Sequence, residues 1–96
     1  MYLCISNAKV RKIMKRIGIL SDTHGVVPNQ VYDFFKDCDE IWHAGDIGSI
    51  DALIELRAFK PLRAVFGNMD GWDIRYETFE NQLFFCEDAK VLMTHI

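Results

Sequence analysis

Short apolar runs alternate with amphipathic segments along most of this chain. The runs at 17–21, 40–44 and 62–66 have the length of buried strands, and apolar residues spaced three and four apart between them indicate helices. Ser49 suits a helix N-cap, and Pro61 ends the second helical segment. This alternation predicts a parallel sheet covered by helices.

The last part of the chain has a different pattern. Two short apolar runs, 83–86 and 90–93, flank Glu87 and Asp88, which indicates a hairpin or the edge of a second sheet. The stretch 72–79 fits neither a helix nor a strand clearly. We therefore expect an α/β chain with a β-α-β-α-β parallel core, followed by a β-hairpin that starts a second sheet.

The first thirteen residues differ from the rest of the chain. They are basic and their apolar residues have no clear period, whereas Met14 opens a run that leads directly into the first strand. We interpret residues 1–13 as an extension that the fold does not require, because chain termini without contacts are commonly disordered. Residues 14–96 are then the folded domain.

Composition is typical of a soluble globular protein. The 96 residues are 50% hydrophobic and 26% charged, and a net charge of -3 gives no basic surface for gripping a nucleic-acid polymer. Cys4, Cys38 and Cys86 are widely separated, which is unlike a disulfide framework and fits a reducing, cytoplasmic setting. No apolar run reaches transmembrane length, so no membrane association is expected.

Polar side chains follow each predicted strand at its carboxyl end, where open α/β sheets bind ligands. These side chains are Asp22, His24, Asp46, Asn68 and His95. Carboxylate and imidazole without thiolate suit borderline divalent metals such as Mn, Fe, Co or Zn. Each residue alone is usually a turn former or a structural residue. Five of them at one sheet edge indicate a metal site.

The short blocks that carry these residues resemble a known family. The blocks are Ser21-Asp22-Thr23-His24-Gly25, then Gly45-Asp46, then Gly67-Asn68-Met69-Asp70, then Thr94-His95. Together they resemble the calcineurin-like metallophosphoesterases, in particular the small bacterial and archaeal phosphodiesterases and their retromer-subunit relatives. The resemblance covers 15–96. It implies an αββα sandwich of two mixed sheets flanked by helices, here truncated because the C-terminal part is lacking.

The same resemblance implies two divalent metal ions, with Mn expected first and Zn, Fe, Ni or Co as alternatives. Asp22 and His24 would bind the first ion, Asp46 would bridge both, and Asn68 and His95 would bind the second. The implied reaction is hydrolysis of a small phosphate ester by a metal-bound hydroxide that attacks phosphorus in line. Asp46, Asn68 and His95 would act in catalysis through that hydroxide.

Two departures from the family pattern leave alternatives open. The family has a further Gly-His-x-His block after the position of His95, which supplies one more ligand to each metal, and this sequence ends at Ile96. Met69 stands where many phosphatases of the superfamily have histidine, and a thioether cannot donate a proton. The alternatives to a phosphodiesterase or phosphatase are a non-catalytic metal-binding interaction module of the same fold and an inactive fragment. An unpaired sheet edge would favour a homo-oligomer.

Four further residues near these blocks are interpreted as structural. His43 lies within the second strand and is expected to be packed or to support the ligands. Asp70 is expected to be a turn residue that caps the next segment. Trp72 and Tyr76 are expected in the core or in an interface rather than in a substrate cleft.

Overall fold

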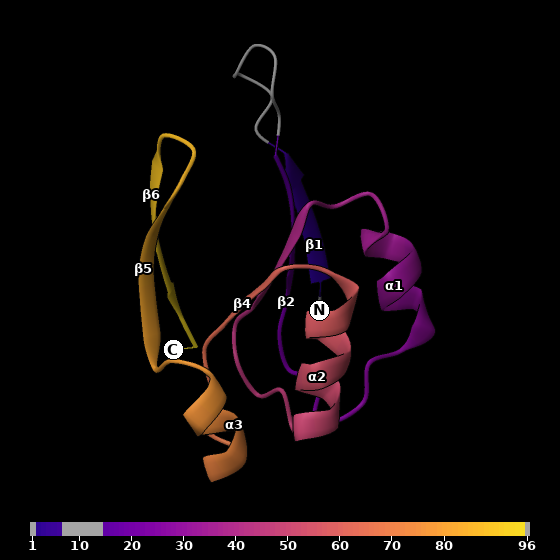
Figure 1. Ribbon diagram of the computed structural model, residues 1–96, viewed down its shortest axis with the longest axis vertical. Helices are drawn as coiled ribbons and strands as arrows, with labels where there is room; N and C mark the ends of the chain where they lie inside the picture. Colours follow the sequence, from indigo (N-terminus) through magenta and orange to yellow (C-terminus); the bar gives the residue numbers. More distant parts are fainter. Residues whose placement is uncertain (1, 7–14, 96) are drawn as a thin grey trace.

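The computed structural model describes residues 2–6 and 15–95, with the side chains of 15–95 (Figure 1). One sheet has the strand order β1-β2-β3-β4, in which β1 is antiparallel to β2 while β2, β3 and β4 are parallel. The other is an antiparallel pair of β5 and β6. In chain order the elements are β1 (Tyr2–Ser6), β2 (Arg16–Leu20), α1 (Asn29–Phe35), β3 (Glu40–His43), α2 (Ile50–Phe59), β4 (Leu62–Ala64), α3 (Trp72–Glu77), β5 (Asn81–Cys86) and β6 (Ala89–Thr94).

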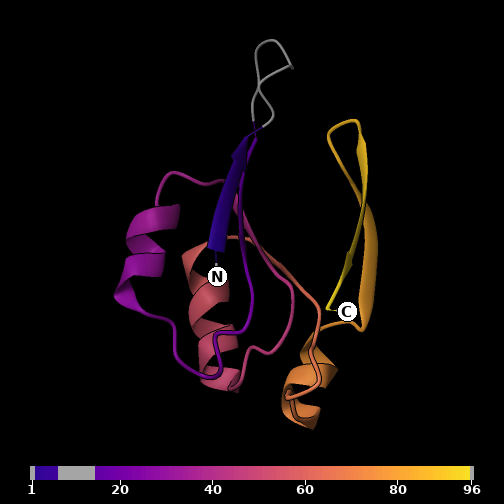
Figure 2. The ribbon, with the colours of Figure 1, turned by 180° about the vertical axis from the view of Figure 1, so that it is seen from behind.

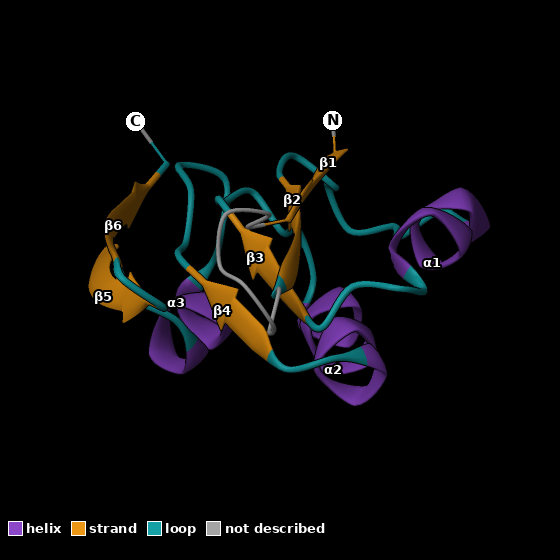
Figure 3. Ribbon diagram, turned by 90° about the horizontal axis from the view of Figure 1, so that it is seen from above, coloured by secondary structure: helices purple, strands orange, loops and turns teal. Residues whose placement is uncertain are grey.

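The larger sheet separates the first two helices from the hairpin. Figure 3 shows α1 and α2 on one face of this sheet and the β5–β6 hairpin on the opposite side. The view from behind shows the same separation (Figure 2). Each face of the sheet is therefore covered by a different part of the chain, and both faces need apolar side chains.

Alternation along the strands supplies those side chains, because successive residues of a strand point to opposite faces. Leu20 of β2 and Ile41 of β3 pack on the α1 side with Val31 and Phe35. Their neighbours face the hairpin. Trp42 packs there against Phe84 of β5, with ring centroids 4.9 Å apart in an edge-to-face arrangement.

The predicted fold class is confirmed by this arrangement: a parallel β2-α1-β3-α2-β4 core is followed by a hairpin. Ser49 is the N-cap of α2, where its hydroxyl accepts a hydrogen bond from the Ala52 N–H at 3.1 Å. The ambiguous stretch 72–79 contains α3. Trp72 and Tyr76 lie on α3 with 77% and 85% of their surface exposed, so they do not lie in the core of this chain; that they lie in an interface stays a prediction.

The first residues add an edge strand to the larger sheet. Residues 2–6 form β1 and pair with the whole of β2, so this part of the expected extension has a regular structure. Residues 1 and 7–14 lie outside the described residues. That the fold does not require residues 1–13 stays a prediction. In the described part of the chain, none of the helices has the length and apolarity that crossing a bilayer needs.

Gly18 of β2 is a position where the packing leaves no room for a side chain. A Cβ atom there would lie 2.6 Å from Cδ1 of Phe35 and 2.9 Å from Cδ1 of Ile41. We predict that Gly18→Ala lowers the free energy of unfolding by about 1–3 kcal/mol, because the buried ring or the strand must move. Urea titration measures this change.

Gly71→Ala is the matched control for Gly18→Ala. The nearest atom to a Cβ at Gly71 is Oδ1 of Asp73 at 3.4 Å, and Gly71 is exposed. We expect it to change the free energy of unfolding by about 0.5 kcal/mol or less. Equal losses in the two variants would show that the ring of Phe35 does not pack against Gly18.

Candidate metal centre

The loop after β2 lies along the loop after β3, at the carboxyl ends of both strands. The backbone N–H of Asp22 donates to the carbonyl of Gly45 at 2.9 Å, and that of His24 donates to the carbonyl of Asp46 at 3.1 Å. Backbone hydrogen bonds therefore hold the two loops side by side, and this fixes the Cα positions of the residues that carry the candidate ligands.

Three of the predicted ligands have an unusual backbone conformation. The φ angles of Asp22, His24 and Asp46 are 57°, 51° and 58°, in the left-handed region that residues other than glycine seldom adopt. Such strain persists only where surrounding contacts impose it, and it concentrates at functional sites. The strained turns redirect these side chains beyond the strand ends.

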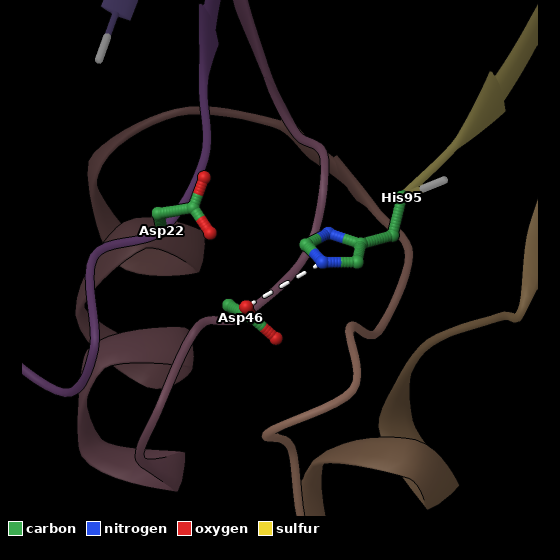
Figure 4. Close-up of side chains that lie close together, drawn as sticks. All are labelled: Asp22, Asp46 and His95. Carbon is green, nitrogen blue, oxygen red and sulfur yellow. Dashed lines mark ion pairs between the residues drawn. The ribbon is translucent and has the colours of Figure 1, made fainter.

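The structure brings three of the five predicted ligands together. Asp22, Asp46 and His95 each offer a ligand atom, and these atoms lie within 4.8 Å of one another (Figure 4). Nε2 of His95 is 3.4 Å from Oδ2 of Asp46. Of the other two, His24 has its Nε2 3.9 Å from Oδ1 of Asp22, and Asn68 lines the same cavity as His95.

The orientation of the His95 ring fits a metal ligand. Nδ1 lies 2.8 Å from the carbonyl oxygen of Ala44, and because a carbonyl can only accept, Nδ1 carries the hydrogen. In the neutral ring Nε2 then presents a lone pair to the Asp46 carboxylate, and two acceptors at this separation need a cation or a proton between them. Histidines that bind metals usually donate their other ring N–H in this way.

Two glycines allow the close approach of these side chains. A Cβ at Gly45 would lie 2.4 Å from Nδ1 of His95, and one at Gly67 would lie 2.1 Å from Oδ1 of Asp46. The backbone N–H of Met69 also donates to Oδ1 of Asp46 at 3.0 Å. The Asp46 carboxylate is thus positioned by the loop after β4, while its second oxygen faces His95.

The electrostatics of the cluster keep Asp22 ionised. The Ser21 hydroxyl, which donates to Oδ2 of Asp22 at 2.9 Å, lowers the pKa of the Asp22 carboxyl. The nearby imidazoles of His95 and His24 act in the same direction, whereas partial burial opposes them. An ionised carboxylate is the form that can bind a cation.

Comparison with protein-family models decides the family. The model of the calcineurin-like phosphoesterase superfamily domain matches residues 14–96. The chain belongs to this superfamily. The resemblance drawn from the four sequence blocks is therefore confirmed.

Curated relatives of this phosphoesterase domain come from archaea. A probable metallophosphoesterase of Methanothermobacter thermautotrophicus is 40% identical over 84 residues, which cover 82% of this chain and 48% of the relative. A second, from Methanocaldococcus jannaschii, is 39% identical over 59 residues, which cover 56% of this chain and 31% of the relative. The chain thus spans at most about half the length of the curated relatives it matches.

Solved structures support the same fold. Vps29 from Entamoeba histolytica has a TM-score of 0.66 at 14% identity, with 81% of this chain and 46% of that chain covered. Yfce, a phosphoesterase from Escherichia coli, has a TM-score of 0.64 at 18% identity, with 81% and 56% covered. These similarities show that the chain has the metallophosphoesterase fold.

Asp70 of this phosphoesterase domain closes the turn 67–70, but the expectation that it caps the next segment is wrong, because the N-cap of α3 is Gly71. Asp70 is buried, and its carboxylate accepts backbone hydrogen bonds from Gly67 at 2.9 Å, Gly48 at 2.9 Å and Ile47 at 3.2 Å. It therefore joins the loop after β3, which carries Asp46, to the loop after β4. The sequence interpretation missed this link because spacing within one loop does not show contacts with another.

His43 supports the cluster from within the sheet, which confirms the expectation that it is packed. Its Nδ1 accepts the Gly45 N–H at 3.1 Å, so in the neutral ring Nε2 carries the hydrogen and donates to the Thr23 hydroxyl at 3.0 Å. That hydroxyl donates to the Ile47 carbonyl at 2.9 Å. Burial lowers the pKa of His43 to about 4, which keeps the ring neutral.

Replacing Asp70 tests the link between the loops. We predict that Asp70→Asn lowers the free energy of unfolding by about 1–3 kcal/mol, because an amide nitrogen cannot accept a backbone N–H and leaves a buried donor unpaired. Urea titration measures the loss. Asp37→Asn on the exposed surface after α1 is the control, and an equal effect of both changes would contradict the role of Asp70.

The buried neutral ring of His43 gives the domain a specific pH dependence. Its folded pKa of about 4 lies below the usual value of about 6.5, so the unfolded state binds more protons between these pH values. Stability is therefore expected to fall as the pH drops from about 6.5 to about 4, by up to about 3 kcal/mol from this group.

Comparison with His43→Gln isolates this contribution, because carboxylates destabilise both proteins equally in acid. Urea titrations across this pH range, in the presence of a chelator, should give a shallower dependence for His43→Gln than for the unmodified protein. The same slope in both proteins would show that His43 is not held in its neutral form.

Proposed function

We propose that this chain carries the metal-binding residues of a divalent-metal-dependent phosphoesterase that acts on small phosphate esters. The observation that carries the proposal is the cluster of Asp22, Asp46 and His95, whose ligand atoms lie within 4.8 Å of one another. The family match and the archaeal relatives, named as probable metallophosphoesterases, support it. A setting in the cytoplasm fits the free thiols of Cys38 and Cys86.

The residue roles follow the arrangement of the cluster. In this proposal Asp22 and His24 hold one divalent ion, Asn68 and His95 hold a second, and the carboxylate of Asp46 serves both. The distance of 3.9 Å between His24 Nε2 and Asp22 Oδ1, and the cavity that Asn68 and His95 both line, support this division. The mixture of carboxylate, imidazole and amide donors favours Mn, with Zn, Fe, Ni or Co as alternatives.

When bound, the ions would lower the pKa of a coordinated water and neutralise the oxygens of the phosphoryl group. The protein residues then fix the geometry and the net charge of the site. Asn68 is a neutral donor, so it leaves more of the positive charge for an anionic ester. The exposed thioether of Met69 cannot protonate a leaving group, which favours esters whose leaving groups depart without a proton.

Replacing the shared carboxylate tests the proposal. Mn binding to the folded state should raise the melting temperature of the unmodified protein, and the protein should hydrolyse a chromogenic phosphodiester such as bis(p-nitrophenyl) phosphate. We predict that Asp46→Asn loses most of the Mn-induced shift and hydrolyses the diester at least about 10–100-fold more slowly. Calorimetry and absorbance assays measure the two effects.

Asp33→Asn makes the same chemical change on the exposed surface of α1 and should leave both measurements unaltered. Equal rates for Asp46→Asn and the unmodified protein would refute hydrolysis at this site. A full Mn-induced shift without turnover would instead favour the alternative of a metal-binding interaction module.

A further inference from the structure

A cavity of about 220 Å³ borders the candidate metal centre. Two of the proposed ligands, Asn68 and His95, form part of its wall, together with Phe66, Arg75 and Glu80. A substituent of a phosphate ester bound at the proposed ion site of Asn68 and His95 would lie next to this space. The chemistry of its wall therefore bears on which esters the site accepts.

Arg75 is held at this cavity by contacts with the loop after β4. Its Nε donates to the carbonyl of Asp70 at 2.7 Å, and Nη2 lies 3.4 Å from the carbonyl oxygen of Gly67 and 3.5 Å from that of Asn68. The guanidinium carbon lies 4.5 Å from the centroid of the Phe66 ring. These contacts fix the guanidinium before any ligand arrives, so little side-chain entropy is lost on binding.

Among the described side chains, no carboxylate pairs with Arg75, in contrast to two other arginines. Arg57 pairs with Glu77 and Arg63 pairs with Glu40, both at 2.9 Å. Within 15–95, by contrast, the hydrogen-bond acceptors of Arg75 are backbone carbonyls, and its Nη1 has no acceptor. A guanidinium with a free amino group is suited to bind a carboxylate or a phosphate.

We propose that Arg75 binds a second anionic group of the substrate, next to the phosphoryl group that would bind the ion at Asn68 and His95. This proposal rests on the proposed function and adds a substrate class to it: phosphate esters that carry a further phosphate or carboxylate beside the reacting phosphorus. Arg75 is a specificity residue in this role, because it contacts the substrate away from the bond that breaks.

Glu80 gives the proposal a second, opposite test. Its carboxylate lines the same cavity and repels an anion that Arg75 attracts. Removing the charge of Glu80 should therefore strengthen binding of a second anionic group, whereas removing the charge of Arg75 should weaken it. A purely structural role of Arg75 predicts no such pair of opposite effects.

Calorimetric titration of the Mn-loaded protein with matched phosphonates tests this inference. Methylphosphonate carries the phosphonate alone, phosphonoacetate adds a carboxylate, and methylenediphosphonate adds a second phosphonate. We expect the unmodified protein to bind each of the two larger probes at least about tenfold more tightly than methylphosphonate. The ratio of these two probes shows whether a carboxylate or a phosphate is preferred.

Arg75→Gln should abolish this preference, and Arg75→Lys should keep part of it. Glu80→Gln should increase it severalfold. Chelation of free Mn by each probe is the same for every variant, so the ratio of variant to unmodified protein reports the contribution of the side chain.

The outcomes separate this inference from the proposed function. Failure of methylphosphonate to bind the Mn-loaded protein would overturn both. Binding of all probes without preference, or an unchanged preference in a folded Arg75→Gln, would overturn only the role of Arg75. Should Arg75→Gln fail to fold, an unchanged preference in Glu80→Gln would overturn it as well.

Discussion

The arrangement of the candidate metal centre depends on the buried carboxylate of Asp70. A buried negative charge is costly unless hydrogen bonds compensate it, and three backbone N–H groups from two loops do so here. Those N–H groups can reach one carboxylate only if the loops after β3 and β4 lie side by side. Their adjacency in turn lets the Met69 N–H fix the carboxylate of Asp46.

Much of the fold could be predicted from local patterns in the sequence. The length and apolar character of β2, β3 and β4 indicate buried strands, and the alternation with helices indicates a parallel sheet. The extent of β4 was harder to predict: the apolar run covers 62–66, but the strand is Leu62–Ala64. Val65 pairs with Phe79 in a single bridge instead of continuing the strand. The helix α3 was missed because its exposed Trp72 and Tyr76 hide the period that marks one buried face.

The residues of the candidate site could be predicted from the sequence, but the contacts that hold them in place could not. Asp22, Asp46 and His95 follow strands, and the topology of a parallel sheet brings strand ends together. The linking role of Asp70 and the placement of Arg75 depend on contacts between loops distant in sequence. The positive φ angles at Asp22, His24 and Asp46 were not predicted either. Aspartate and histidine adopt this conformation more often than most residues, but the contacts between loops that impose it here are not visible in the sequence.

The hairpin provides His95, while Asp22 and Asp46 belong to loops of the other sheet. Two contacts place His95 next to these loops. Its ring is hydrogen-bonded to the carbonyl of Ala44, and the hairpin packs on the larger sheet through contacts such as that of Phe84 with Trp42. An ion that binds both Asp46 and His95 would act as a non-covalent cross-link between two sheets. By thermodynamic linkage, any change that stabilises the packed position of the hairpin would raise the affinity for this ion. Binding of the ion would stabilise that packed position by the same free energy.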